Sequence, residues 1–189
     1  QYVLDTTYRL FDATTYAGKT VKVYTYEPSE TVSVFSITGA KMTSFDGSKL
    51  TDTRTITVKD AGLSAITLPQ SSKLCELNLS DNNFTSFDLS PYSVLVALSL
   101  NNNRLTTLDL SNNSNLQVAS ASGNKLSNVV LNNPNLWALY VGDNQLKSIS
   151  FDNALSLQQR ELSHNLLTTL DVGKLSQLRA LAIDNNYFR

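Results

Sequence analysis

A repeat of about 21 residues occupies most of the chain and decides what it can fold into. Two consecutive copies, LCELNLSDNNFTSFDLSPYSV and LVALSLNNNRLTTLDLSNNSN, begin at Leu74 and Leu95 and carry leucine and asparagine at matching places. Further copies begin at residues 116, 136, 157 and 178, so the period is 21 residues except for one step of 20. A fixed period of this length predicts a solenoid, in which each coil buries its apolar side against its neighbours.

Apolar residues at fixed places predict how each coil is built. If the first leucine of each copy is position 1, positions 4 and 6 are apolar while positions 3, 5 and 7 face solvent, which is the alternation of a short strand. The same strand in successive coils should stack in parallel at a spacing of about 4.8 Å. Positions 11, 14 and 16 repeat the apolar spacing. The pattern therefore predicts extended chain on both long sides of each coil, with little or no helix.

An asparagine at position 9 ends each predicted strand. Its carboxamide carries both donors and an acceptor, so it can pair with backbone groups that a tight corner would otherwise bury without partners. We expect each such hydrogen bond to contribute about 1 kcal/mol net. The predicted structural column consists of Asn82, Asn103, Asn124, Asn144, Asn165 and Asn186.

The repeat becomes irregular toward the N-terminus. The two coils that cover residues 32–73 keep the apolar positions but carry Ala40 and Ala61 in place of the asparagine. Residues 1–31 do not fit the repeat, and their tyrosine-, threonine- and valine-rich segments favour a β-rich cap over the alternative, a linker from a preceding domain. The predicted domains are this cap and an array over 32–189 of about eight coils, the first two degenerate and the last incomplete.

The complete pattern, LxxLxLxxNxLxxLDLxxN, resembles the 21-residue leucine-rich repeat of bacterial surface proteins, the internalin-like class. The resemblance covers residues 53–189 well and 32–52 weakly. It implies a leucine-rich-repeat solenoid, of the right-handed β/α superhelix class, that serves as an extracellular or cell-surface binding module in adhesion or host interaction. Many members of the class carry cysteine at position 6. This chain has aliphatic side chains or alanine there, and Cys75 is its single cysteine, so no cysteine ladder is carried over.

Charge and hydropathy exclude two kinds of partner. With 15 basic and 16 acidic residues the formal charge is −1, so no overall field attracts nucleic acid or an anionic membrane. The longest apolar runs are far shorter than the roughly 18 residues that span a bilayer. We therefore predict no nucleic-acid partner and no membrane insertion.

Large and charged side chains gather at the exposed strand positions and strand ends of the last three coils. The concave face of a curved repeat array is its usual binding surface, and tryptophan and tyrosine are common anchors of interfaces. The alternative for Trp137 is packing against the neighbouring coil. The candidate ligand-binding patch, for a protein or a glycan, consists of Trp137, Tyr140, Asp143, Gln159, Glu161, His164 and Arg179.

The sequence gives little support for catalysis or for a metal site. Glu161 and His164 are the one conceivable acid–base pair, and a single histidine without a second histidine or a cysteine is a poor set of transition-metal ligands. We predict no enzyme activity, no metal and no cofactor. Acidic residues at position 15 are interpreted as caps of turns, with a calcium site as the alternative. They are Asp46, Asp88, Asp109 and Asp171.

Two features depart from the pattern. Arg160 occupies position 4, and because an unpaired guanidinium is costly to bury, we expect a local bulge or a side chain that reaches solvent past Leu139 and Leu181. The last coil has apolar side chains without a predicted cap, so the chain could self-associate through it. A structural or self-associating cell-envelope scaffold is therefore the alternative to recognition.

Overall fold

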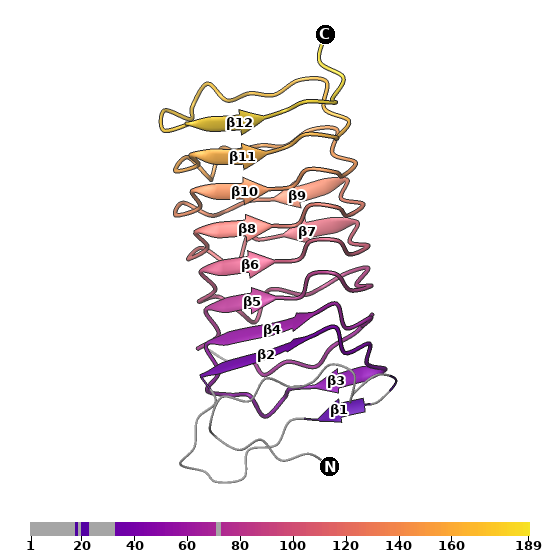
Figure 1. The fold of residues 1–189 in the computed structure, drawn as a ribbon. Helices are drawn as coiled ribbons and strands as arrows, with labels where there is room; N and C mark the ends of the chain where they lie inside the picture. Colours follow the sequence, from indigo (N-terminus) through magenta and orange to yellow (C-terminus); the bar gives the residue numbers. More distant parts are fainter. Residues whose placement is uncertain (1–17, 19, 23–32, 71–72) are drawn as a thin grey trace.

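The computed structural model describes residues 18, 20–22, 33–70 and 73–189. Over these residues the chain winds into a stack of coils, and each coil places one strand in a common parallel sheet (Figure 1). The described residues form no helix, and hence none that is long and apolar enough to cross a membrane. The predicted solenoid, mostly β and irregular, is confirmed.

Eight strands form the main sheet, and all neighbouring strands are parallel. The register joins position 4 of each coil to position 4 of the next, so the inward-facing side chains form a continuous row. In spatial order the strands are β2 (Val34–Thr38), β4 (Thr55–Lys59), β5 (Glu76–Asn78), β6 (Ala97–Ser99), β8 (Val118–Ser120), β10 (Ala138–Tyr140), β11 (Gln159–Glu161) and β12 (Ala180–Ala182).

The opposite side of the coils is extended but only partly paired. There β7 (Thr107–Asp109) pairs in parallel with β9 (Asn128–Val130), and β1 (Thr20–Lys22) pairs in parallel with β3 (Ser44–Asp46). Strand β1 and Gly18 are the described parts of the predicted cap over 1–31, and the rest of that cap lies outside the described residues.

Burial follows the alternation that the repeat predicts. In β4, Ile56 and Val58 are fully buried, while the side chains on either side of them stay partly exposed. Apart from Arg160, the same positions in the other coils belong to or pack against one hydrophobic cluster that runs through the stack. Because a fully buried leucine or isoleucine stabilises a protein by about 2 kcal/mol, this continuous row is the main source of the array's stability.

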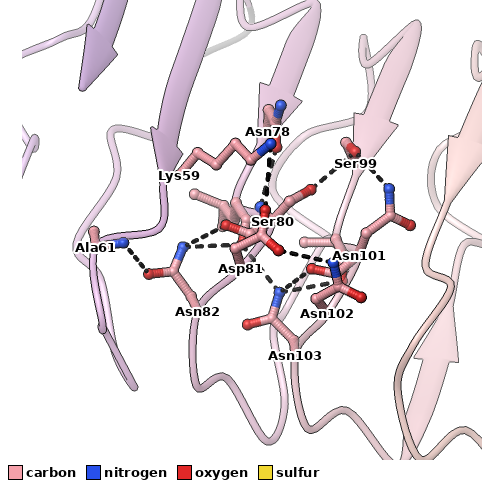
Figure 2. Close-up of polar contacts among 12 residues, drawn as sticks. Lys59, Ala61, Asn78, Ser80, Asp81, Asn82, Ser99, Asn101, Asn102 and Asn103 are labelled. Atoms are coloured by element: carbon pink, nitrogen blue, oxygen red, sulfur yellow. Dashed lines mark hydrogen bonds and ion pairs between the residues drawn. The ribbon is translucent and has the colours of Figure 1, made fainter. Parts of the chain in front are cut away.

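Asn82 shows how position 9 connects two coils (Figure 2). Its Oδ1 accepts the backbone N–H of Ala61 at 3.2 Å. The same oxygen accepts the N–H of Leu63 at 3.1 Å, and Nδ2 donates to the carbonyl oxygens of Val58 and Leu79 at 2.8 and 3.0 Å. Each asparagine of the column thus bridges its own coil and the one before it through backbone groups. The arrangement recurs at Asn103, Asn124, Asn144, Asn165 and Asn186.

Two further asparagines are buried at another corner of the coils. Asn113 Nδ2 donates to the carbonyl oxygens of Leu89 and Tyr92 at 3.0 and 2.9 Å. Asn133 Nδ2 donates to those of Leu110 and Asn113 at 3.0 and 2.8 Å. Asn133 lies in the coil that is one residue short, so its carboxamide bridges coils at the shortened turn. The last asparagine of the repeat pattern was the available signal for both residues, and its role was missed.

Every strand of the main sheet is followed at position 8 by a residue with positive φ, from 47° to 72°. Glycine adopts this left-handed conformation without steric cost, and asparagine and aspartate tolerate it better than most residues. Position 8 is therefore a sharp turn that carries short polar side chains along one edge of the sheet. The residues are Gly39, Asp60, Asp81, Asn102, Gly123, Asp143, His164 and Asn185.

Candidate functional site

Positions 3, 5 and 7 of the coils, with the flanking positions 2 and 8, form the outer face of the main sheet, here called the sheet face. Two regions of it differ in chemistry. The C-terminal patch is the set of seven residues predicted above, from Trp137 to Arg179. The hydroxyl groove, which lies nearer the N-terminus, is lined at its polar positions by Thr55, Thr57, Glu76, Asn78, Ser99, Ser120 and Tyr140.

The structure brings part of the C-terminal patch together. The Tyr140 hydroxyl donates to Gln159 Oε1 at 2.8 Å, and the register of β10 and β11 places Glu161 beside Tyr140. Glu161 Oε1 accepts the Ser163 backbone N–H at 2.7 Å, which holds this carboxylate at the end of its own strand. Trp137 precedes β10 and is 37% exposed, so its ring is neither fully buried against the next coil nor fully free.

Three charged members of the patch, Asp143, His164 and Arg179, fall on the turns that flank the strands, whereas Glu161 lies in β11. Asp143 and His164 both adopt the left-handed turn at position 8, so backbone geometry places these side chains at the edge of the sheet face. His164 Nδ1 lies 3.6 Å from Asp143 Oδ1, and its Nε2 lies 2.8 Å from Asn185 Nδ2. Arg179 is exposed just before β12. Among the described contacts, no hydrogen bond or ion pair joins His164 to Glu161.

The hydroxyl groove has a volume of about 420 Å³ and crosses β4, β5, β6 and β8 to reach Tyr140 on β10. Small side chains at positions 3 and 5, among them Ala97, Ser99 and Ser120, leave this space open. The sequence pattern placed these residues on the exposed face but did not single them out as a site. The available signal was the run of small residues in consecutive coils, which leaves room above the sheet.

A hydrogen-bonded network of hydroxyls and amides crosses the groove (Figure 2). Asn101 Nδ2 donates to Ser99 Oγ at 3.3 Å. Asn101 Oδ1 accepts from Ser120 Oγ at 2.6 Å. Ser99 Oγ in turn lies 3.0 Å from Ser80 Oγ, and the Ser80 backbone N–H donates to Asn78 Oδ1 at 3.0 Å. The polar floor of the groove is thus ordered before any ligand arrives.

The prediction for Arg160 is wrong. The side chain is 2% exposed and does not reach solvent, and β11 keeps its regular pairing with Leu139 and Leu181, so there is no bulge. The guanidinium lies 4.4 Å from the centre of the Phe151 ring, and Nη2 donates to the Leu157 carbonyl oxygen at 3.3 Å. This cation–π contact and the weak hydration of guanidinium are the physical reasons that burial is tolerated here.

Burial nevertheless has a cost at Arg160. Its Nε and Nη1 atoms are buried without a hydrogen-bond partner. Desolvation lowers the pKa of Arg160 to about 10, because the low-dielectric interior disfavours the charged form. The core of the coil that begins at residue 157 therefore holds an incompletely paired cation, whereas the two neighbouring coils hold Leu139 and Leu181 at the same position.

The aspartates at position 15 act as caps of turns, as predicted. Each accepts the backbone N–H of the residue two places further along the chain, at 2.9 or 3.0 Å. In Asp88 this hydrogen bond, from Ser90, lowers the pKa of the carboxyl. Among the residues with described positions, no group of three or more histidine, cysteine, aspartate or glutamate side chains gathers as metal ligands.

Solved structures similar to this chain share its fold. No protein-family model and no curated protein matches the sequence. The functional domain of InlJ from Listeria monocytogenes, described as including a cysteine ladder, aligns with a TM-score of 0.73 at 25% identity, over 77% of this chain and 33% of its own. The leucine-rich effector YopM from Yersinia pestis aligns with a TM-score of 0.63 at 23% identity, over 72% of this chain and 44% of its own.

A second internalin, InlF from Listeria monocytogenes, gives a TM-score of 0.62 at 22% identity, over 79% of this chain and 50% of its own. The chain thus spans from one third to one half of these proteins. Unlike the described InlJ domain it has no cysteine ladder, because Cys75 is its only cysteine and is free. The chain therefore has the leucine-rich-repeat fold, and it resembles the internalin-like class of bacterial proteins that its repeat pattern indicates.

Proposed function

We propose that the chain is a non-catalytic recognition module that binds a protein or a glycan through the sheet face, outside a bacterial cell or on its surface. The observation that carries this proposal is the rigidity of that face. Eight hydrogen-bonded strands hold its exposed side chains in place, so binding would cost little ordering entropy. Adhesion or host interaction is the role that the internalin-like resemblance supports.

The chemistry of the sheet face also supports recognition. It combines a groove with an ordered polar floor and a patch that contains the partly exposed Trp137. The acid–base pair that catalysis would need is not joined, since the Glu161 carboxylate accepts the backbone N–H of Ser163 and His164 lies between Asp143 and Asn185. We propose that the module works without metal or cofactor and binds neither nucleic acid nor the membrane interior.

Replacing Trp137 and Tyr140 together by alanine is expected to weaken ligand binding at least about thirtyfold, because truncating an anchor residue typically costs about 2 kcal/mol. The ligand is first identified by screening the purified chain against arrays of glycans and host proteins. Leu155→Ala serves as the control, because Leu155 is also a large exposed apolar residue, at 46%, but lies outside the sheet face. Unchanged affinity in a double variant that melts like the wild type would exclude the C-terminal patch.

Self-association is the second candidate function, because β12 is the end strand of the main sheet. Ile183 is only partly buried, whereas Val141 at the same position is fully buried, and Tyr187 and Phe188 are 62% and 39% exposed. An exposed apolar strand edge favours strand pairing between molecules.

If the chain is a scaffold, its mass by light scattering should rise with protein concentration, and Ile183→Lys should return it to the monomer mass. The lysine should act by placing a charge in the apolar contact. Thr57→Lys is the control, because it adds the same charge on β4, away from the end strand. A constant monomer mass in the wild-type protein would exclude this function.

A further inference from the structure

We infer that the hydroxyl groove binds a neutral, linear oligosaccharide that lies along the stacking direction of the coils. This inference rests on the proposed recognition function and deepens it, since it names the chemistry of the ligand and places it in the groove rather than in the C-terminal patch alone.

The groove is sized for a narrow ligand. Its volume of about 420 Å³ falls in the range of small-ligand sites, and it runs across five consecutive strands. Among its lining residues, Tyr140 is the only aromatic one, and none is arginine or tryptophan. The groove thus lacks most of the anchor types that dominate protein–protein interfaces.

The hydroxyl of Ser99 is directed toward the ligand by its neighbours. Ser80 is only 4% exposed, and the hydrogen bond of its hydroxyl is to Ser99 Oγ at 3.0 Å, so we assign Ser80 as the donor. Ser99 Oγ then accepts from both Ser80 and Asn101. Its own O–H is left to point into the groove as a donor.

The neighbouring strands add fixed donors and acceptors. Asn78 Oδ1 is used by the backbone N–H of Ser80, so its Nδ2 group offers a donor. Ser120 donates to Asn101, so its remaining lone pair offers an acceptor. Strands β5, β6 and β8 thus present donor, donor and acceptor at steps of about 4.8 Å. Sugar hydroxyls match such a mixed row because each can donate and accept.

Charge and backbone chemistry distinguish an oligosaccharide from a peptide or an acidic sugar. The strands of the main sheet already use their N–H and C=O groups with their neighbours, so the floor cannot pair with the backbone of an extended peptide. Glu76, which accepts a hydrogen bond from Thr55 at 3.3 Å, is the only charged residue that lines the groove. An anionic ligand would meet this carboxylate and no cation.

Tyr140 closes the end of the groove with an aromatic ring. Its hydroxyl is held by Gln159 at 2.8 Å, which fixes the ring beside the space above β8. An aromatic ring with a polar tip suits a ligand that has one apolar face and many hydroxyls. A pyranose ring has that character, so Tyr140 would stack on a terminal sugar of the chain.

The test titrates the purified chain with cellotetraose, maltotetraose and chitotetraose as neutral linear probes and with tetragalacturonate as the acidic probe, by calorimetry and saturation-transfer NMR. At least one neutral probe should bind. Ser99→Leu, which fills the groove, should weaken binding of that neutral probe at least tenfold. Ser99→Ala removes one hydrogen bond and should weaken it about fivefold. Ser36→Leu is the matched control, because Ser36 has position 5 in β2 outside the groove, and it should bind like the wild type.

The outcomes separate this inference from the proposed function. If no neutral probe binds but a protein from the array does, and Ser99→Leu leaves that protein bound, the inference is overturned and recognition stands. Binding of a neutral probe that Ser99→Leu does not weaken, or tighter binding of tetragalacturonate, also overturns it. If neither probes nor arrays give a ligand, the proposed function fails as well.

Discussion

Asn82→Ala is expected to lower the free energy of unfolding by about 4 kcal/mol, because it removes partners from several buried backbone groups at once. In the native chain, Asn82 binds the carbonyl oxygens of Val58 and Leu79 and the N–H groups of Ala61 and Leu63. Each buried group left without a partner costs about 1–3 kcal/mol, and water entering the corner would restore only some of them. The measurement is urea unfolding followed by circular dichroism.

Asn83→Ala is the matched control, because the two asparagines are adjacent in the sequence. Asn83 Nδ2 makes a single described hydrogen bond, at 3.0 Å to the Gly62 carbonyl oxygen at an exposed site, so its loss should cost less than about 1 kcal/mol. Equal losses of stability in the two variants would show that position 9 has no special structural role.

The fold could be predicted from sequence because each element is repeated in many coils. One leucine or asparagine, such as Leu77 or Asn82, gives little information about the fold. The same residue types recur in later coils at nearly constant spacing, and a single coil structure accounts for all of them. The parallel sheet, the extended opposite side and the turn-capping role of Asp88 follow from this periodicity.

The hydroxyl groove was less predictable than the fold because it depends on side chains that are small. Ser99 and Ser120 give no signal by themselves, and the groove above them arises only when their coils are stacked. Asn133 was missed although its asparagine is part of the repeat pattern, because its bridge to Leu110 and Asn113 exists only when the coils are stacked. The prediction for Arg160 was wrong for a different reason. The pattern could not reveal that Phe151 would lie 4.4 Å from its guanidinium.

Arg160→Leu is expected to raise the free energy of unfolding by about 2 kcal/mol, a gain that few core substitutions give. Burial lowers the pKa of Arg160 from its ordinary value to about 10, and at about 1.4 kcal/mol per tenfold change in proton affinity this corresponds to a penalty of about 3 kcal/mol. Loss of the contact with Phe151 offsets about 1 kcal/mol of the gain. Arg179→Leu, at an exposed site, should change stability by less than about 0.5 kcal/mol.

The advantage of Arg160→Leu should also depend on pH. Below about pH 9 Arg160 is protonated in both the folded and the unfolded wild type, so the full penalty is present and the advantage is constant. Above about pH 10 the folded state releases this proton before the unfolded state does. Stability returns to the wild type as a result, and the difference in free energy of unfolding between the variant and the wild type narrows.

Ionisation of Tyr92 lowers stability over the same pH range in which deprotonation of Arg160 raises it. Only the difference in free energy of unfolding between wild type and variant therefore reports on Arg160. Burial raises the pKa of Tyr92, so the unfolded chain ionises first above pH 10 and both proteins lose stability equally. Unfolding curves of wild type and Arg160→Leu from pH 7 to pH 11 therefore isolate the buried guanidinium. A variant no more stable than the wild type at pH 7 would mean that the contacts of Arg160 fully offset its burial.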